Sequence, residues 1–174
     1  MKSSTAPSPL ARLWSFGELA ISALDALRPL AQLAARVYVG AVFFRAGMSK
    51  LRDWDSTLAL FTDESHVPLL DPTVGAFMGT GAELALPVLL VAGLLGRVAA
   101  AGLSVLNVVV LSLMDVADAA LQGHLFWGSL LAALLLWGPG AWSPDFVVWP
   151  RLRAGFVPLN AARRSSAPRA IRAA

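Results

Sequence analysis

The chain has 174 residues, of which 57% are apolar and 14% are charged, with no cysteine and a net charge of +3. Soluble domains are nearer about 45–50% apolar and about 25% charged, so these values indicate one domain built for a lipid environment. They exclude disulfides, Fe–S clusters and thiol chemistry supplied by this chain. The basic residues gather at the ends and beside apolar stretches, which favours contact with anionic lipid over nucleic acid.

Residues 1–29 form the first segment. Residues 1–9 are rich in Ser, Pro and Ala and are expected to be disordered. Residues 10–27 place apolar side chains on one side at helical spacing, which predicts a short interfacial helix with Trp14 at headgroup depth. A helix packed against the rest of the molecule fits the same pattern. Pro29 is expected to break the chain or to open the next helix, and no cleavable signal peptide is apparent.

Residues 30–150 are predicted to form a domain of four transmembrane helices, because about 20 residues in a helix cross the hydrocarbon core of a bilayer. Residues 51–73 read as a polar loop with an amphipathic piece, and residues 118–123 as a turn. A basic tail at 151–174 is expected to be disordered. The predicted fold is an all-α integral membrane four-helix bundle with an N-terminal interfacial helix, with spans at 30–49, 74–95, 98–116 and 124–137.

The distribution of Lys and Arg predicts the orientation. With the N-terminus inside, ten basic residues lie on the cytoplasmic side, and only Lys50 and Arg52 lie outside. The remaining two, Arg36 and Arg45, fall within the first span. The sequence therefore predicts a multi-pass protein of the bacterial inner membrane with both termini in the cytoplasm.

Several motifs occur in a fixed order along the spans. The first span reads Arg36-x3-Gly40-x2-Phe43-Phe44-x2-Gly47-x2-Lys50-Leu51. The second span holds Ala82-Glu83-Leu84 and then Leu95-Gly96-Arg97. The fourth span begins with His124-Leu125-Phe126-Trp127 and is followed by Gly138-Pro139-Gly140 and Ser143-Pro144-Asp145. Residues 36–145 resemble the DoxX family in this order, with Pro144 where an apolar residue is usual. The resemblance implies a four-helix membrane protein linked to redox processes. Members serve as a subunit of a thiosulfate:quinone oxidoreductase, as partners in oxidative-stress complexes, or beside gene clusters for copper-binding peptides.

Two polar residues fall near the middle of the predicted membrane. A lone carboxylate there is very unfavourable, so Glu83 is expected to be protonated or paired, with Arg45 and Arg36 as the candidate cations. Asn107 in the third span is expected to hydrogen-bond a neighbouring helix. Because the second and third spans are antiparallel, a Glu83–Asn107 contact is predicted. Two interpretations stay open, a structural pair and a proton-handling or quinone-contacting site.

Glycines lie on the same stripes as these polar residues. Gly40 and Gly47 share a heptad seam with Arg36, and Gly75 and Gly79 share a four-residue stripe with Glu83. Such small residues let helices approach closely, so the four glycines are predicted to be packing positions. Arg36 is expected to extend toward the cytoplasmic headgroups.

The outer end of the predicted bundle gathers possible metal ligands. Thioether and imidazole groups suit Cu(I), but their spacing is not that of a metal motif, and Met at helix ends is usually apolar filler. No metal site is expected; the candidates would be Met48, Met78, Met114, His66 and His124. His124 is expected to cap a helix or to pair with Asp115 or Asp118, with a proton relay or quinone ligand as the alternative.

Three functions remain compatible with the sequence, which holds no phosphate loop, dinucleotide fingerprint or metalloprotease motif. The first is a non-catalytic membrane subunit or anchor of a redox or stress-response system, contacting lipid and a protein partner, with no nucleic acid and with homo-oligomers open. The second is a quinone-interacting oxidoreductase subunit that holds the headgroup with Glu83, Asn107 and Arg36 or Arg45. The third is a small proton or metal transporter. Quinone is the one candidate cofactor.

Overall fold

The computed structural model describes residues 9–63, 70–113, 118–138 and 140–156. These residues form helices and contain no strand, so the all-α prediction is confirmed. The helices are α1 (Pro9–Arg52), α2 (Trp54–Asp63), α3 (Pro72–Ala92), α4 (Gly96–Leu113), α5 (Asp118–Trp137) and α6 (Pro144–Phe156).

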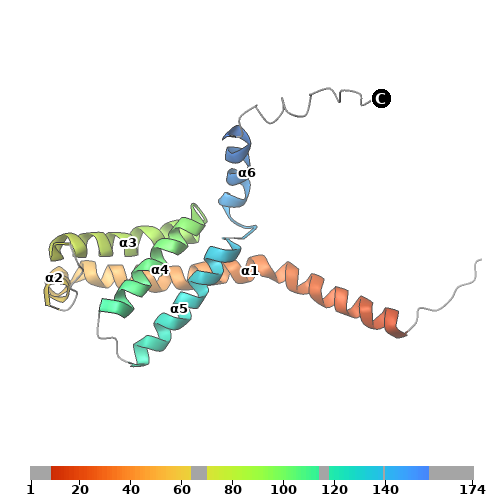
Figure 1. Cartoon of the computed structure of the whole chain (residues 1–174), viewed down its shortest axis with the longest axis horizontal. Coiled ribbons are helices and arrows are strands. Elements are labelled where there is room, and N and C mark those ends of the chain that lie inside the picture. Colours follow the sequence, from red (N-terminus) through yellow and green to blue (C-terminus); the bar gives the residue numbers. More distant parts are fainter. Residues whose placement is uncertain (1–8, 64–69, 114–117, 139, 157–174) are drawn as a thin grey trace, which may run out of the picture.

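Four helices surround one apolar core. In Figure 1, α3, α4 and α5 lie along one part of α1, and the rest of α1 extends away from them. Helix α1 packs on α3 and α5, and α4 packs on the same two helices, which closes the bundle. All four contribute to a buried cluster: Val39, Phe43, Leu90, Ala99, Ala100, Leu103, Leu131 and Leu134.

Two of the described helices are long and apolar enough to cross a membrane. These are α3, Pro72–Ala92, and the Ala120–Trp137 part of α5, while the apolar Gly96–Ser112 part of α4 is shorter. Large apolar side chains such as Phe77, Val88 and Val105 point outward from the bundle. By length and apolar composition, two of the four predicted spans are long enough to cross a membrane. The first predicted span is part of the longer helix α1.

A tight turn joins α3 to α4. Asp71 caps the start of α3 by accepting hydrogen bonds from the backbone N–H groups of Thr73 and Val74. At the other end Gly93 has φ 71°, and Leu94 N–H donates to Leu89 O. This left-handed glycine ending allows the chain to reverse within a few residues. The predicted short connection between antiparallel neighbours is therefore confirmed.

The predicted break at Pro29 is wrong. Helix α1 continues through it from Pro9 to Arg52, and the side chains of residues 14–28 are exposed. Proline removes one backbone hydrogen bond, but the surrounding Leu and Ala residues are strong helix formers that sustain the helix. The alternative in which this segment packs on the bundle is also wrong, whereas its predicted place at the membrane surface stays a prediction.

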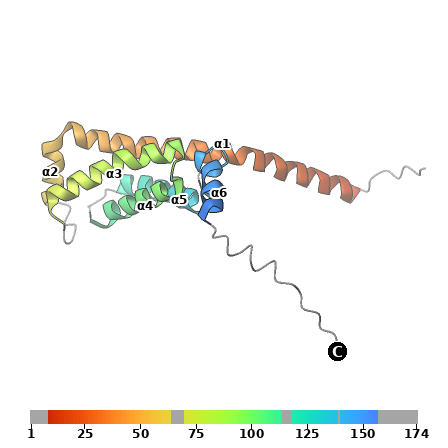
Figure 2. The same ribbon diagram turned by 90° about the horizontal axis from the view of Figure 1, so that it is seen from above.

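Three further boundaries differ from expectation or refine it. Residues 118–123, expected to form a turn, are the beginning of α5. Asp118 lies in its first turn, where a negative side chain interacts favourably with the helix dipole. Residues 151–156 belong to α6, so the tail does not begin at 151, and residues 157–174 lie outside the described part. The amphipathic piece expected within residues 51–73 is confirmed as α2, Trp54–Asp63. Figure 2 shows α2 at the end of the bundle opposite the extended part of α1.

Candidate functional site

A buried ion pair joins α1 to α3. Lys50 lies in the last turn of α1, and its Nζ is 2.6 Å from Oε1 of Glu83 in the middle of α3. The side chains are 18% and 7% exposed, respectively. Gly47 permits this approach, because a methyl group at that position would lie 3.1 Å from Cβ of Glu83. The sequence predicted a cation for Glu83, and the structure supplies Lys50 in place of Arg36 or Arg45.

Two buried polar side-chain atoms of α3 have no hydrogen-bond partner among the described residues. They are Oε2 of Glu83 and Oγ1 of Thr80, and both residues are at least nine-tenths buried. Positions 80 and 83 are one turn apart, so the two side chains share a face of α3. Buried polar groups are normally paired, which makes this part of α3 a candidate binding site.

Helix α2 closes the same region from the side. Its Phe61 ring lies against α3, where methyl groups at Gly75 and Gly79 would meet ring atoms at 3.3 and 3.2 Å. Nζ of Lys50 is 5.9 Å from the centroid of that ring. The hydroxyl of Thr57 hydrogen-bonds the backbone oxygen of Lys50 and holds α2 against the end of α1.

Asp53 caps the start of α2 in the adjoining turn. Its carboxylate accepts hydrogen bonds from the hydroxyl and the backbone N–H of Ser56. These bonds lower the pKa of Asp53 below its ordinary value because they favour the charged form.

A second polar pair joins α4 to α5. Oδ1 of Asn107 is 2.8 Å from Nδ1 of His124, and its Nδ2 donates to the backbone oxygen of His124 at 3.0 Å. Gly128 leaves room for the amide, since a methyl group there would lie 3.1 Å from that nitrogen. The His124 ring also meets Trp127 edge to face at 5.0 Å. The expected pairing of His124 with Asp118 does not form; Asp115 lies outside the described residues.

Arg36 is buried at the other end of the bundle. It is 1% exposed, so the expected extension toward the headgroups is wrong. Its Nη2 donates to the backbone oxygen of Trp142, and a methyl group at Gly93 would lie 2.5 Å from its Nη1. Ser143 donates to the backbone oxygen of Gly93, so this loop and the α3–α4 turn enclose the guanidinium together.

The first turn of α6, which follows this loop, caps α4. Oδ1 and Oδ2 of Asp145 accept hydrogen bonds from the backbone N–H groups of Leu95 and Gly96 at 2.9 and 2.6 Å. Asp145 thereby fills the role of a helix cap from 49 residues further along the chain. Sequence reasoning recorded this residue only as part of a motif, because a distant cap leaves no local signal.

The polar residues predicted as candidates for a buried polar or quinone site therefore do not form one site. Glu83 pairs with Lys50 of α1, Asn107 and His124 pair between α4 and α5, and Arg36 donates to the backbone oxygen of Trp142. Arg45 is exposed. The predicted Glu83–Asn107 contact is wrong. The two residues were expected at similar depths on neighbouring helices, but each side chain points to a different partner.

The predicted packing glycines and metal candidates have separate surroundings. Methyl groups at Gly40 and Gly47 would crowd α3, whereas Gly75 and Gly79 face Phe61 of α2. Among the described residues no group of three or more His, Cys, Asp and Glu side chains could hold a metal ion. Of the proposed ligands, Met78 is exposed, Met48 is half-buried, and Met114 and His66 lie outside the described residues.

Sequence reasoning missed Lys50 and Thr80 as parts of the site. Lys50 belongs to the first-span motif and its heptad seam, but the sequence did not identify it as the cation for Glu83. Its position three residues after Gly47 on the same seam was the available signal. Thr80 carried no signal, because a threonine in an apolar helix usually bonds its own backbone.

A family model described as DoxX matches residues 31–115. The matched segment holds Arg36, Lys50, Glu83 and Asn107 and ends before His124 and Asp145. No curated protein and no solved structure matches the chain.

Proposed function

The chain belongs to the DoxX family of membrane proteins through residues 31–115, and from this premise we propose that it is a membrane subunit or anchor of a redox or stress-response system in the bacterial inner membrane. The redox or stress part of this proposal is supported by the resemblance of its span motifs to that family. The anchoring part is supported by the part of α1 that extends away from the bundle.

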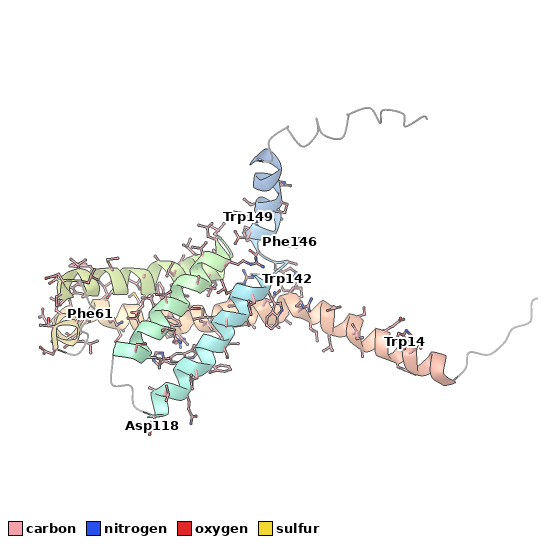
Figure 3. All side chains as sticks on the ribbon, viewed as in Figure 1. Trp14, Phe61, Asp118, Trp142, Phe146 and Trp149 are labelled. Carbon is pink, nitrogen blue, oxygen red and sulfur yellow. The ribbon has the colours of Figure 1, made fainter. Side chains whose placement is uncertain are left out.

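The extended part of α1 is the observation that carries the anchoring role. Figure 3 shows Trp14 near the far end of this helix, away from the bundle. Trp14 is 74% exposed, and its neighbours Phe16, Leu19, Ile21 and Leu24 are exposed as well. A helical surface with this many large apolar side chains is suited to contact with a membrane surface or a partner protein.

The proposed topology places α1, α3, α4 and α5 across the bilayer. At about 1.5 Å per residue, the 18 residues of α4 span about 27 Å, close to the thickness of the hydrocarbon core. The end of α1 that carries Lys50 and Arg52 then lies at the outer side of the membrane. The extended part of α1 and helix α6 lie at the cytoplasmic side.

Single cysteines test this topology cleanly, because the chain has none of its own. Ser56→Cys in α2 is expected to react with a membrane-impermeant maleimide in intact cells. Ser22→Cys in the extended part of α1 is expected to react only after the membrane is permeabilised. Labelling of both positions in intact cells, or of Ser22→Cys alone, would rule the orientation out.

Purification in mild detergent tests the subunit role. The full chain is expected to bring down a partner that carries a redox cofactor, recognised by its absorption spectrum. The double variant Ile21→Asn/Leu24→Asn should lose that partner, whereas Ser22→Ala on the polar side should keep it. A cofactor-bearing partner that stays equally bound to the double variant would show that α1 is not the contact, and its absence from wild type would contradict the subunit role.

A further inference from the structure

Thr80 differs from other hydroxyl-bearing residues of these helices. The hydroxyls of Thr57, Thr62, Ser104 and Ser129 each donate to a backbone oxygen three or four residues earlier. That local bond is the usual choice for Ser and Thr in a helix. Oγ1 of Thr80 is buried and makes no such bond, nor any other among the described residues. Its hydroxyl is therefore available to a group from outside α3.

Glu83 presents a complementary atom one turn away. Lys50 donates to Oε1 at 2.6 Å in the ion pair, so that oxygen already has a partner. Oε2 is buried and has no donor among the described residues. An ionised carboxylate only accepts hydrogen bonds, so whatever satisfies Oε2 must supply a hydrogen atom.

The charges around these two atoms limit the ligand. A cation would stand beside the ammonium group of Lys50, and an anion would stand beside the carboxylate of Glu83. Burying such like charges together is unfavourable. A neutral hydroxyl group avoids both conflicts, since it can donate to Oε2 and accept from the Thr80 hydroxyl at once.

We propose that Thr80 and Glu83 form a binding site for one neutral hydroxyl group on the buried face of α3, beside Lys50 of α1. The ring of Phe61 lies against Gly75 and Gly79 of the same helix and is 5.9 Å from Nζ of Lys50, so it adds an apolar surface near the ion pair. Two sources supply such a group, a water molecule and the hydroxyl of a lipid-soluble alcohol or phenol. This site is independent of the partner proposed for α1, because it lies within the bundle, whereas the proposed partner contact lies on the extended part of α1.

Infrared spectroscopy of the purified full-length protein in detergent reads the carboxylate of Glu83 directly, with its bands identified by subtraction of Glu83→Gln. Thr80→Val removes the hydroxyl, Thr80→Ser keeps it, and Thr62→Val is the matched control, because that hydroxyl already bonds its own helix. Phenol is the probe, and toluene is its counterpart without a hydroxyl.

In wild type, Thr80→Ser and Thr62→Val, Glu83 is expected to show the same carboxylate band. Thr80→Val should shift that band if water is the occupant. A saturable shift with phenol and none with toluene, lost in Thr80→Val, identifies a lipid-soluble hydroxyl.

Identical spectra for Thr80→Val and wild type, together with no phenol effect in wild type, would overturn the proposal. So would a protonated-acid band of Glu83. The phenol and toluene titrations on wild type decide the matter for lipid-soluble ligands even if Thr80→Val does not fold, and Thr80→Ala then replaces it.

Discussion

The Lys50–Glu83 pair makes each partner depend on the other. Lys50→Met would leave the carboxylate of Glu83, 7% exposed, without its cation. Removing one member of a buried pair typically costs about 3–5 kcal/mol, and the partial exposure of Lys50 places the expected loss at about 3 kcal/mol. Thermal unfolding in one detergent measures this as a lower midpoint.

The double variant Lys50→Met/Glu83→Met provides the control. Replacing a whole buried pair by apolar side chains of similar size is often nearly neutral, so it should recover most of the loss. A Lys50→Met midpoint equal to that of wild type would show that the pair does not contribute to stability, and failure of the double variant to recover would point to lost packing.

Burial of the polar residues was predictable, but their partners were not. Glu83 and Asn107 each lie in an apolar run, and the cost of an unpaired polar group in such a run implies a partner. The partner depends on how each helix is rotated, and that rotation is set by the whole bundle. Lys50 is 33 residues from Glu83, and His124 is 17 from Asn107, so no local pattern links either pair.

At the scale of helices, the contact between α1 and α3 depends on Gly40. A methyl group at that position would lie 2.6 Å from Cγ2 of Val91 and 3.5 Å from the backbone oxygen of Pro87. Since valine has one strongly preferred rotamer in a helix, it cannot turn away freely. Gly40→Ala is therefore expected to push the helices apart and to cost about 1–3 kcal/mol in thermal unfolding.

Two further variants separate crowding from a general effect of alanine. Gly40→Ala/Val91→Ala removes the clashing methyl group and should recover part of the stability. Gly81→Ala lies on the same bundle with nothing within 4 Å of the added methyl group, so no loss is expected there. An equal loss at both glycines would argue against crowding as the cause.

The start of α4 depends on Asp145 in the first turn of α6. Asp145→Ala removes both acceptors for the N–H groups of Leu95 and Gly96, and loss of a helix cap costs about 1–2 kcal/mol. Hydrogen exchange at these two amides should become faster, while Asp145→Asn, which keeps one acceptor, should show a smaller change. Unchanged exchange in Asp145→Ala would mean that the cap is dispensable.

The sequence predicts the helices well where their ends carry local signals. Asp71-Pro72 and Gly93 mark the ends of α3 through a cap, a first-turn proline and a left-handed glycine. Pro29 misled because a proline is normally a helix breaker, whereas the residues around it favour the helix strongly enough to continue. The start of α4 is capped by Asp145, which lies far along the chain, so the residues around the start of α4 do not reveal the cap.

At the scale of the whole molecule, the bundle and the extended part of α1 are separable. Side chains of residues 14–28 are exposed, and the apolar core draws on α1 only from residue 39 onward, with Ala35 packed against it. Folding of the bundle therefore does not require the extension. A chain beginning at Pro29 should fold, because proline is well tolerated at the first turn of a helix.

This truncation is expected to leave the unfolding midpoint of the bundle nearly unchanged, measured by the far-UV circular dichroism of purified protein in detergent. Leu90→Ala in the full chain serves as the comparison, since Leu90 is fully buried and its truncation should cost about 2–5 kcal/mol. If removing residues 1–28 lowered the midpoint as much as Leu90→Ala does, the extension would be part of the folded unit. An unchanged midpoint, combined with loss of the partner or of membrane-surface contact, would assign α1 two roles along its length: a structural one from Pro29 onward and a docking one before it.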